Sequence, residues 1–352
     1  MIRALVVLAL CTLPGLSVAQ SPPPAEPIGA PATAAAIDAG IGWLLRHQEE
    51  AGGWSASQFQ RHDPKGDLCT GTGKPDQDLH VTAWATLALL ARGNTERTGP
   101  HRQPVQKALA WLDTQKQDDG FFGAPEAGNA VVAHALSCLA MSEGKGLSDQ
   151  AMPKKSLARL AALRLPDGTW PVRLGETKGD PMTTYWASMG CGSRAAFGGV
   201  KMDLETTLMT MAKGGLAAPT PPSIEAMLRW IAQHHPKDDA RLVALTATLG
   251  AQLPQWRDGQ EAARMDFLDW HVGTFAMFQA GGAAWQRWHA ALQAALVDHQ
   301  RTDGAHVGSW DPVDANGKQG GRIYATAVNV LSLAVGHRFG RIVDRGGAAK
   351  KK

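Results

Sequence analysis

The chain has 352 residues and a formal net charge of +3, with 35 Lys and Arg residues against 32 Asp and Glu residues. Apolar residues make up 44% of it, which is enough for a sizeable core in one large domain or two. The nearly balanced charge predicts neither a nucleic acid nor an acidic polymer as partner.

Residues 1–19 carry the three zones of a cleavable signal peptide. Arg3 is followed by an apolar run that ends at Leu16 and then by small residues. The sequence therefore predicts an exported protein, periplasmic or secreted, whose mature chain begins at Gln20. No later segment has about 18 uncharged apolar residues in a row, so no transmembrane segment is expected.

The two ends of the mature chain have compositions typical of disorder. Residues 20–34 are rich in Pro and Ala, which predicts a stiff, disordered leader. Residues 341–352 end in three lysines, which predicts a basic, disordered tail. We therefore expect one folded domain over residues 35–340.

Every strong periodicity between these ends is close to that of a helix. The first example places Ile37, Ile41 and Leu44 on one helical face. No alternating strand pattern competes with the helical segments. The sequence predicts helices over residues 35–50, 78–92, 102–117, 127–143, 153–164, 181–197, 202–214, 222–235, 239–251, 265–280, 284–300 and 321–338.

The expected helices are of two kinds. Residues 83–91, 130–141 and 325–335 are apolar on nearly all sides, which suits an inner ring that is packed on both faces. Residues 102–117 and 286–300 carry charge on one face, which suits an outer ring. Paired in this way, the helices predict a closed six-fold barrel of helical hairpins.

A repeated motif joins the helices of each pair. In its clearest copy Gln300 is expected to close the last turn of its helix, Gly304 follows in a tight turn, and Trp310 lies ahead of the next helix. Degenerate copies contain Gly120 and Gly168 after an Asp, and all three Gly residues are expected at positive φ. Since one helical hairpin cannot bury its own apolar face, several copies must stack.

This motif resembles the QW-type repeat of the squalene-hopene cyclase and protein prenyltransferase β-subunit superfamily. Residues 269–279, together with the C-terminal copy, are similar to secreted bacterial prenyltransferase/squalene oxidase repeat proteins. The resemblance extends over residues 35–340 and implies an all-α fold, the α/α toroid. A fold of this kind does not define a function.

The acid motif of the cyclases in this superfamily is missing. Those enzymes protonate an alkene with Asp-x-Asp-Asp, because an acid held protonated beside other acids is strong enough for that step. The nearest cluster here is Asp76 and Asp78, which is more simply explained as the cap and first-turn acids of a helix.

The sequence also gives no metal site. Prenyltransferases of the superfamily hold zinc through Asp-x-Cys and a distant His, and Asp67-Leu68-Cys69 has that spacing. It lies in a Gly-rich loop and not at an inner helix, and His80, His134 and His271 are single helical histidines of the kind usually found in cores. We therefore predict no metal and no cofactor.

Three cysteines remain in the mature chain: Cys69, Cys138 and Cys191. An export compartment allows one disulfide among them and leaves one thiol over. The spacing does not select the pair.

The densest group of polar and aromatic residues provides the candidate site. Acid-base candidates are Asp266, Asp269 and His271, which fall within two turns of one expected inner helix. Candidate ligand-binding residues are Tyr185, Trp186, Trp270, Arg322 and Tyr324. The N-terminal turns of inner helices open at one rim of a toroid, where these groups can converge on a ligand.

The preferred interpretation is a binding scaffold without cyclase chemistry. Its partner would be an apolar or extended ligand, or a protein, at the axial cavity. The alternative is a divergent enzyme, either terpenoid cyclase-like or a polysaccharide lyase or hydrolase, whose carboxylates perform acid-base chemistry in that cavity. The sequence determines neither the ligand nor the oligomeric state.

Overall fold

The computed structural model describes residues 30–145, 153–193 and 202–338. The described residues are helical with connecting loops, and they form no strand beyond a single bridge between Lys116 and Phe122. The α-helices are α1 (Ala30–Arg46), α2 (Asp78–Ala91), α3 (Arg102–Thr114), α4 (Ala130–Gly144), α5 (Lys154–Ala162), α6 (Pro181–Gly192), α7 (Leu204–Ala212), α8 (Pro222–Ile231), α9 (Ala240–Ala251), α10 (Phe267–Ala280), α11 (Gly282–Val297) and α12 (Gly317–Arg338).

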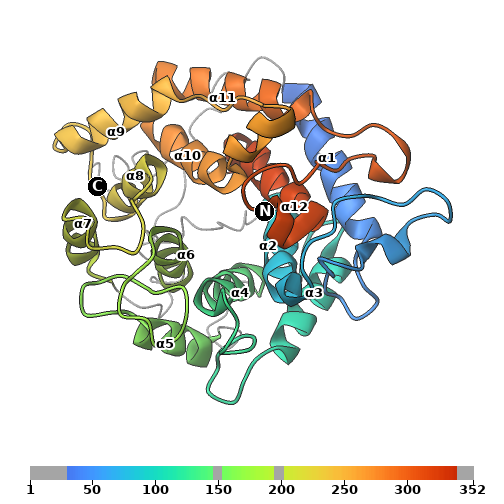
Figure 1. The fold of residues 1–352 in the computed structure, drawn as a ribbon, viewed down its shortest axis with the longest axis horizontal. Helices are drawn as coiled ribbons and strands as arrows, with labels where there is room; N and C mark the ends of the chain where they lie inside the picture. Colours follow the sequence, from blue (N-terminus) through green and yellow to red (C-terminus); the bar gives the residue numbers. More distant parts are fainter. Residues whose placement is uncertain (1–29, 146–152, 194–201, 339–352) are drawn as a thin grey trace.

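The helices form two concentric rings (Figure 1). The even-numbered helices make the inner ring, in which each helix packs against the next, and α12 packs against α2 to close the circle. The odd-numbered helices lie outside them (Figure 1). The predicted all-α toroid and the assignment of helices to its two rings are both confirmed.

Burial explains which helix joins which ring. On α4, Val132 is the one residue that is not fully buried between Ala130 and Gly144, because this helix packs on all sides. On α3 the buried residues are Val105, Ala108, Leu109 and Leu112, at the spacing of a single helical face. A helix with one apolar face can only cover a core, whereas one with apolar residues all round can lie inside it.

Most helix boundaries differ from the sequence prediction by one to five residues, and two of the larger differences lie at the starts of α1 and α12. Helix α1 begins at Ala30, so residues 30–34 belong to the first helix and not to the disordered leader. Pro31 explains the difference, because the first turn of a helix needs no N–H from Pro and accepts its fixed φ. Helix α12 includes residues 317–320 ahead of Gly321, whose φ of 64° introduces a kink.

The repeated tryptophan joins an outer helix to the following inner helix. The indole N–H groups of Trp54, Trp170 and Trp310 donate to the carbonyls of Leu44, Leu160 and Leu296 at 2.7–2.8 Å. Their backbone N–H groups donate to the hydroxyls of Thr82, Thr184 and Thr326. In the second repeat Phe122 replaces the indole, and its N–H donates to Nδ1 of His134 at 3.1 Å. His134 is therefore a structural residue of the repeat.

The repeated glutamine has a different role from the one expected. We expected it to close the last turn of its own helix. Instead, the Gln300 side chain donates to Gly308 O in the turn and to Ala36 O on α1, both at 2.8 Å. Gln48 similarly reaches Gly52 O and Pro104 O on α3. A long side-chain amide can reach carbonyls of the neighbouring repeat, so it ties one repeat to the next.

The predicted turn glycines are confirmed. Gly120, Gly168 and Gly304 have φ of 92°, 84° and 48°. None of the described helices is both long and apolar enough to cross a membrane. The predicted signal peptide, most of the leader and all of the basic tail lie outside the described residues.

Candidate functional site

The acid-base candidates Asp266 and Asp269 lie at the N-terminal end of α10. Asp266 is the N-cap, and its Oδ1 accepts hydrogen bonds from the backbone N–H groups of Leu268 and Asp269 at 2.9 and 3.0 Å. Asp269 accepts a hydrogen bond from the hydroxyl of Ser223 on α8. Burial raises the pKa of both carboxyls, and the charge of Asp266 adds to the rise at Asp269.

A third carboxylate, Asp314, joins them from the loop before α12. Its Oδ2 accepts from the hydroxyl of Tyr324 at 2.9 Å and from the N–H of Phe267 at 3.2 Å. Its Oδ1 is buried and has no hydrogen-bond partner. Burial, with a contribution from the charge of Asp266, raises the pKa of Asp314 to about 6. No local pattern in the sequence marks this residue, because its environment comes from α10 and α12.

The third acid-base candidate, His271, lies in a different environment. It is 2% exposed and stacks on Trp186 of α6 with ring centroids 5.9 Å apart. Trp84 of α2 meets both rings edge-on, at 4.8 Å from Trp186 and 6.2 Å from His271. Burial lowers the pKa of His271 to about 3, so the imidazole is neutral at neutral pH.

These three aromatic side chains come from alternate helices of the inner ring. Helices α2, α6 and α10 are separated from one another by α4, α8 and α12 around the axis (Figure 1). Because Trp84, Trp186 and His271 nevertheless touch, their rings fill the axis of the toroid at this level. An open axial cavity at this depth, which the sequence led us to expect, is not what the structure shows.

The remaining candidate ligand-binding residues are engaged in internal contacts. The Arg322 guanidinium is fully buried and donates to Thr70 O at 2.7 Å, to the Ser309 hydroxyl at 2.9 Å and to Asp311. Trp270 packs on Phe267, with centroids 5.5 Å apart. Tyr185 is fully buried, and its hydroxyl has no hydrogen-bond partner. The structure therefore brings Asp266, Asp269 and Tyr324 together, and places Arg322 in a loop anchor.

A pocket of about 610 Å³ lies beside the N-terminus of α2, and no motif in the sequence indicates it. Three carboxylates (Glu49, Glu50 and Asp78), the Arg61 guanidinium and the Trp111 indole line it. Asp78 Oδ1 accepts from Ala56 N at 2.8 Å and from the Ser55 hydroxyl at 3.3 Å. Burial raises the pKa of Asp78, and the charge of Glu49 contributes to the rise.

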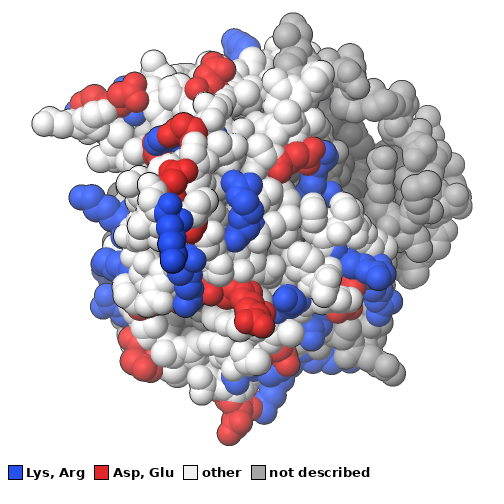
Figure 2. Space-filling view, turned by 90° about the vertical axis from the view of Figure 1, so that its right-hand side faces the viewer, with Lys and Arg blue, Asp and Glu red and all other residues white. Residues whose placement is uncertain are grey.

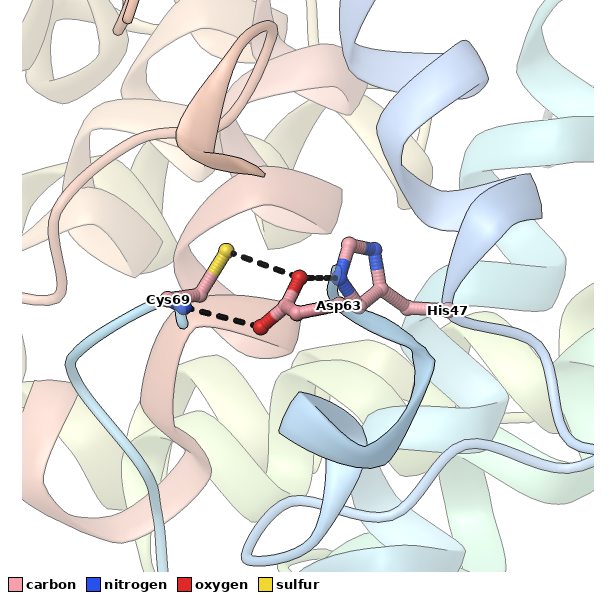
Figure 3. A group of neighbouring side chains, drawn as sticks. All are labelled: His47, Asp63 and Cys69. Atoms are coloured by element: carbon pink, nitrogen blue, oxygen red, sulfur yellow. Dashed lines mark hydrogen bonds and ion pairs between the residues drawn. The ribbon is translucent and has the colours of Figure 1, made fainter. Parts of the chain in front are cut away.

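His47, Asp63 and Cys69 form a buried cluster at the end of α1 (Figure 3). Asp63 Oδ1 lies 2.8 Å from His47 Nε2 and 3.3 Å from Cys69 Sγ. Burial lowers the pKa of His47. Burial alone would raise the pKa of Asp63, but hydrogen bonds from Cys69 and His47 outweigh it and hold that pKa below its usual value. Burial and the adjacent Asp63 raise the pKa of Cys69 to about 12.

The Asp-x-Cys spacing considered in the sequence does not form this cluster. Asp67 accepts a hydrogen bond from Ala305 N at 2.8 Å and serves as a loop anchor. The three cysteines are buried as free thiols. The cluster thus depends on Asp63, which the spacing rule did not select.

The charged side chains form no continuous single-sign patch on the face shown in Figure 2, where Lys and Arg lie among Asp and Glu. A polyanion partner needs a clustered basic surface. This face therefore offers no such surface.

Comparisons with known proteins agree with the observed architecture. The profile of the squalene-hopene cyclase C-terminal domain matches residues 24–129. A variant of the type II terpene cyclase MstE from Scytonema, in complex with geranylgeranyl dihydroxybenzoate, superposes with a TM-score of 0.60 and 15% identity. That match covers 87% of this chain and 97% of the cyclase.

Apo MstE gives the same TM-score and identity, over 86% of this chain and 97% of the cyclase. No curated protein is significantly similar in sequence. The chain therefore has the α/α-toroid fold of the terpenoid cyclase superfamily.

Proposed function

We propose that this protein is an exported ligand-binding scaffold that uses the terpenoid cyclase fold without cyclase chemistry. The observation that carries the proposal is the contact of Trp84, Trp186 and His271 across the axis. A cyclase must enclose its whole substrate, whereas here aromatic side chains occupy the axis. Asp266 supports the proposal as well, because its Oδ1 serves the helix N-terminus as a cap.

The pocket beside α2 is the proposed binding site. Its volume of about 610 Å³ suits a small molecule. Its lining holds three carboxylates against one guanidinium, and Arg61 is itself paired with Glu49 at 2.7 Å. The half-buried indole of Trp111 adds an aromatic surface. Carboxylates beside an indole favour a small ligand that carries a cationic group, not the apolar ligand that the sequence allowed.

The raised pKa of Asp78 supports a cationic ligand on physical grounds. Burial makes ionisation of Asp78 unfavourable, and the neighbouring charge of Glu49 makes it more so. A cation in the pocket would offset both effects and would favour the ionised carboxylate. Binding of such a ligand should therefore strengthen as the pH rises and Asp78 ionises.

Choline is a suitable probe, and calorimetric titration of the full chain measures its binding. Trp111→Ala should raise the Kd by about 2-fold to 30-fold, the range that corresponds to a cation-π contact. Asp78→Asn should also raise the Kd, because it removes a negative charge that attracts the cation. Glu261→Gln is the control, because Glu261 is exposed, pairs with Arg264 and lies outside the pocket. Equal affinity of the Trp111→Ala protein and the parent chain would contradict the proposed site. Turnover of geranylgeranyl dihydroxybenzoate, the substrate of MstE, to a cyclised product would contradict the absence of cyclase chemistry.

A second candidate function is acid catalysis at Asp314. Its pKa of about 6 and its buried, unpartnered Oδ1 are the features of a carboxylic acid that can hold and release a proton near neutral pH. Asp266, at the start of α10, lies close enough for its charge to contribute to the raised pKa of Asp314, so a second carboxylate is available for acid-base chemistry. If a substrate is turned over, Asp314→Asn should abolish turnover and Asp303→Asn, an exposed acid elsewhere, should not.

A further inference from the structure

The contacts of His47 leave its Nε2 facing a negatively charged atom. Nδ1 lies 2.8 Å from the carbonyl oxygen of Trp43, and a carbonyl can only accept, so Nδ1 carries the proton. A neutral imidazole then directs the lone pair of Nε2 towards Asp63 Oδ1, 2.8 Å away. Cys69 Sγ approaches the same oxygen at 3.3 Å. Figure 3 shows the Asp63 carboxylate between the Cys69 thiol and the His47 imidazole, so three atoms that can donate electron pairs lie close together.

We propose that His47, Asp63 and Cys69 bind one Zn²⁺ ion. Their ligand atoms all lie within 4.8 Å of one another. In a tetrahedral zinc site with ordinary bond lengths, neighbouring ligand atoms are about 3.3–3.6 Å apart. The two separations from Asp63 Oδ1, 2.8 and 3.3 Å, are at or below that spacing, and the third pair lies within 4.8 Å, so the side chains would rotate to surround the ion.

The types of ligand select the metal. Imidazole, thiolate and carboxylate together suit zinc, whereas magnesium and calcium bind through oxygen. Three protein ligands leave a fourth position for water. The ligands themselves are held in place, because Trp43 O accepts from His47 Nδ1 and Cys69 N donates to Asp63 Oδ2 at 2.8 Å. The Trp43 ring also stacks on His47 with centroids 3.9 Å apart.

The site lies where the first repeat meets the last. His47 follows α1, and Asp63 and Cys69 belong to the loop that continues to Thr70. Thr70 N donates to Nε2 of His306 at 3.0 Å, and Asp67 binds Ala305 N. A zinc ion would therefore fasten α1 to the loop that closes the toroid, and its removal should lower the stability of that closure.

Metal content of the full chain, purified without added chelator, tests the proposal directly. We expect about one zinc ion per chain in the parent protein, as for a single site. Cys69→Ser and His47→Gln should lose most of it. Cys191→Ser, which removes another buried free thiol, should retain it. Loss of zinc in all variants or in none would overturn the assignment.

Two further measurements keep the test decisive if a variant folds poorly. After removal of metal by a chelator, added Zn²⁺ should raise the Tm of the parent chain and of Cys191→Ser but not that of Cys69→Ser. Substitution with Co²⁺ should produce a thiolate-to-cobalt charge-transfer band that Cys69→Ser abolishes. A doubly protonated His47 would donate both hydrogen bonds, to Trp43 O and to Asp63, without a metal. In that case the parent chain would bind no zinc and added Zn²⁺ would leave its Tm unchanged, and the proposal would be wrong.

Discussion

Trp84 and Trp186 come from two inner helices that are not neighbours, yet their ring centroids lie 4.8 Å apart. Both are at most 2% exposed, and His271 completes the group from a third helix. The contact means that large aromatic side chains join the inner ring across its axis. At this level the centre of the toroid is therefore filled by side chains.

Because of this contact, a substitution that removes one of the axial rings should lower the free energy of unfolding strongly. Trp186→Ala should lower the free energy of unfolding by about 3–5 kcal/mol, because it removes a buried aromatic ring and leaves a cavity. Trp186→Phe should cost much less, since the indole Nε1 has no hydrogen-bond partner to lose. Urea denaturation measures both. Added indole should partly restore the Tm of Trp186→Ala by occupying the cavity; equal stability of Trp186→Ala and the parent chain would show that the axis is not filled.

Asp314 predicts a specific pH dependence of stability. Its pKa rises from 3.8 in the unfolded chain to about 6 in the folded protein. Between these values the folded chain keeps a proton that the unfolded chain releases, so the free energy of unfolding falls as pH rises and levels off above about 6. Asp314→Asn removes this penalty, because its side-chain oxygen can still accept from Tyr324 and Phe267.

Asp314→Asn should therefore be more stable than the parent chain at pH 8, by about 3 kcal/mol. The gain should disappear at pH 4, where the parent carboxyl is protonated. Asp303→Asn is the control, because the neighbouring Arg301 lowers the pKa of Asp303 to about 2 and its substitution should give no gain. Denaturant titrations at both pH values measure the difference. A gain of the same size at pH 4 would rule out the raised pKa as its cause.

Substitution of Gly304 should lower stability for two reasons, backbone strain and a clash with Asp67. Its φ is 48°, and an added Cβ would lie 2.7 Å from both carboxylate oxygens of Asp67. Gly304→Val should lower the free energy of unfolding by more than about 1 kcal/mol. Gly66→Val has a similar positive φ with open space around it, so it should show the backbone strain alone. Thermal melts compare the two, and an unchanged Tm for Gly304→Val would contradict the predicted role of this turn.

The threonine hydroxyl that accepts a hydrogen bond from the backbone N–H of the repeated tryptophan should stabilise its repeat. Thr184 is buried and its hydroxyl accepts from Trp170 N at 2.9 Å. Thr184→Val keeps the shape but leaves that N–H without a partner, which should cost about 1–3 kcal/mol. Thr248→Val is the matched control, since Thr248 is exposed and bonds within its own helix. Equal costs at the two positions in urea denaturation would argue against a structural role for the tryptophan contact.

The sequence by itself determined the helices, their assignment to two rings and the turn glycines. Each of these depends on residues within one or two turns of one another, where spacing fixes the contact. Which face of an inner helix meets the axis was not determined. Helices such as α4 are apolar all round, so their sequences contain no difference between an axial and an outward face. The contact of Trp84 with Trp186 and His271 therefore appeared only in the tertiary structure.

The same limit applies to the two polar clusters. Asp314 lies beside Asp266 because the loop before α12 folds back over the N-terminus of α10. His47, Asp63 and Cys69 meet because the loop after α1 returns to the end of that helix. In both cases chemistry depends on loop geometry and burial, which set the pKa values and the convergence of ligand atoms. Local spacing encodes neither, because the path of each loop in the folded chain decides both.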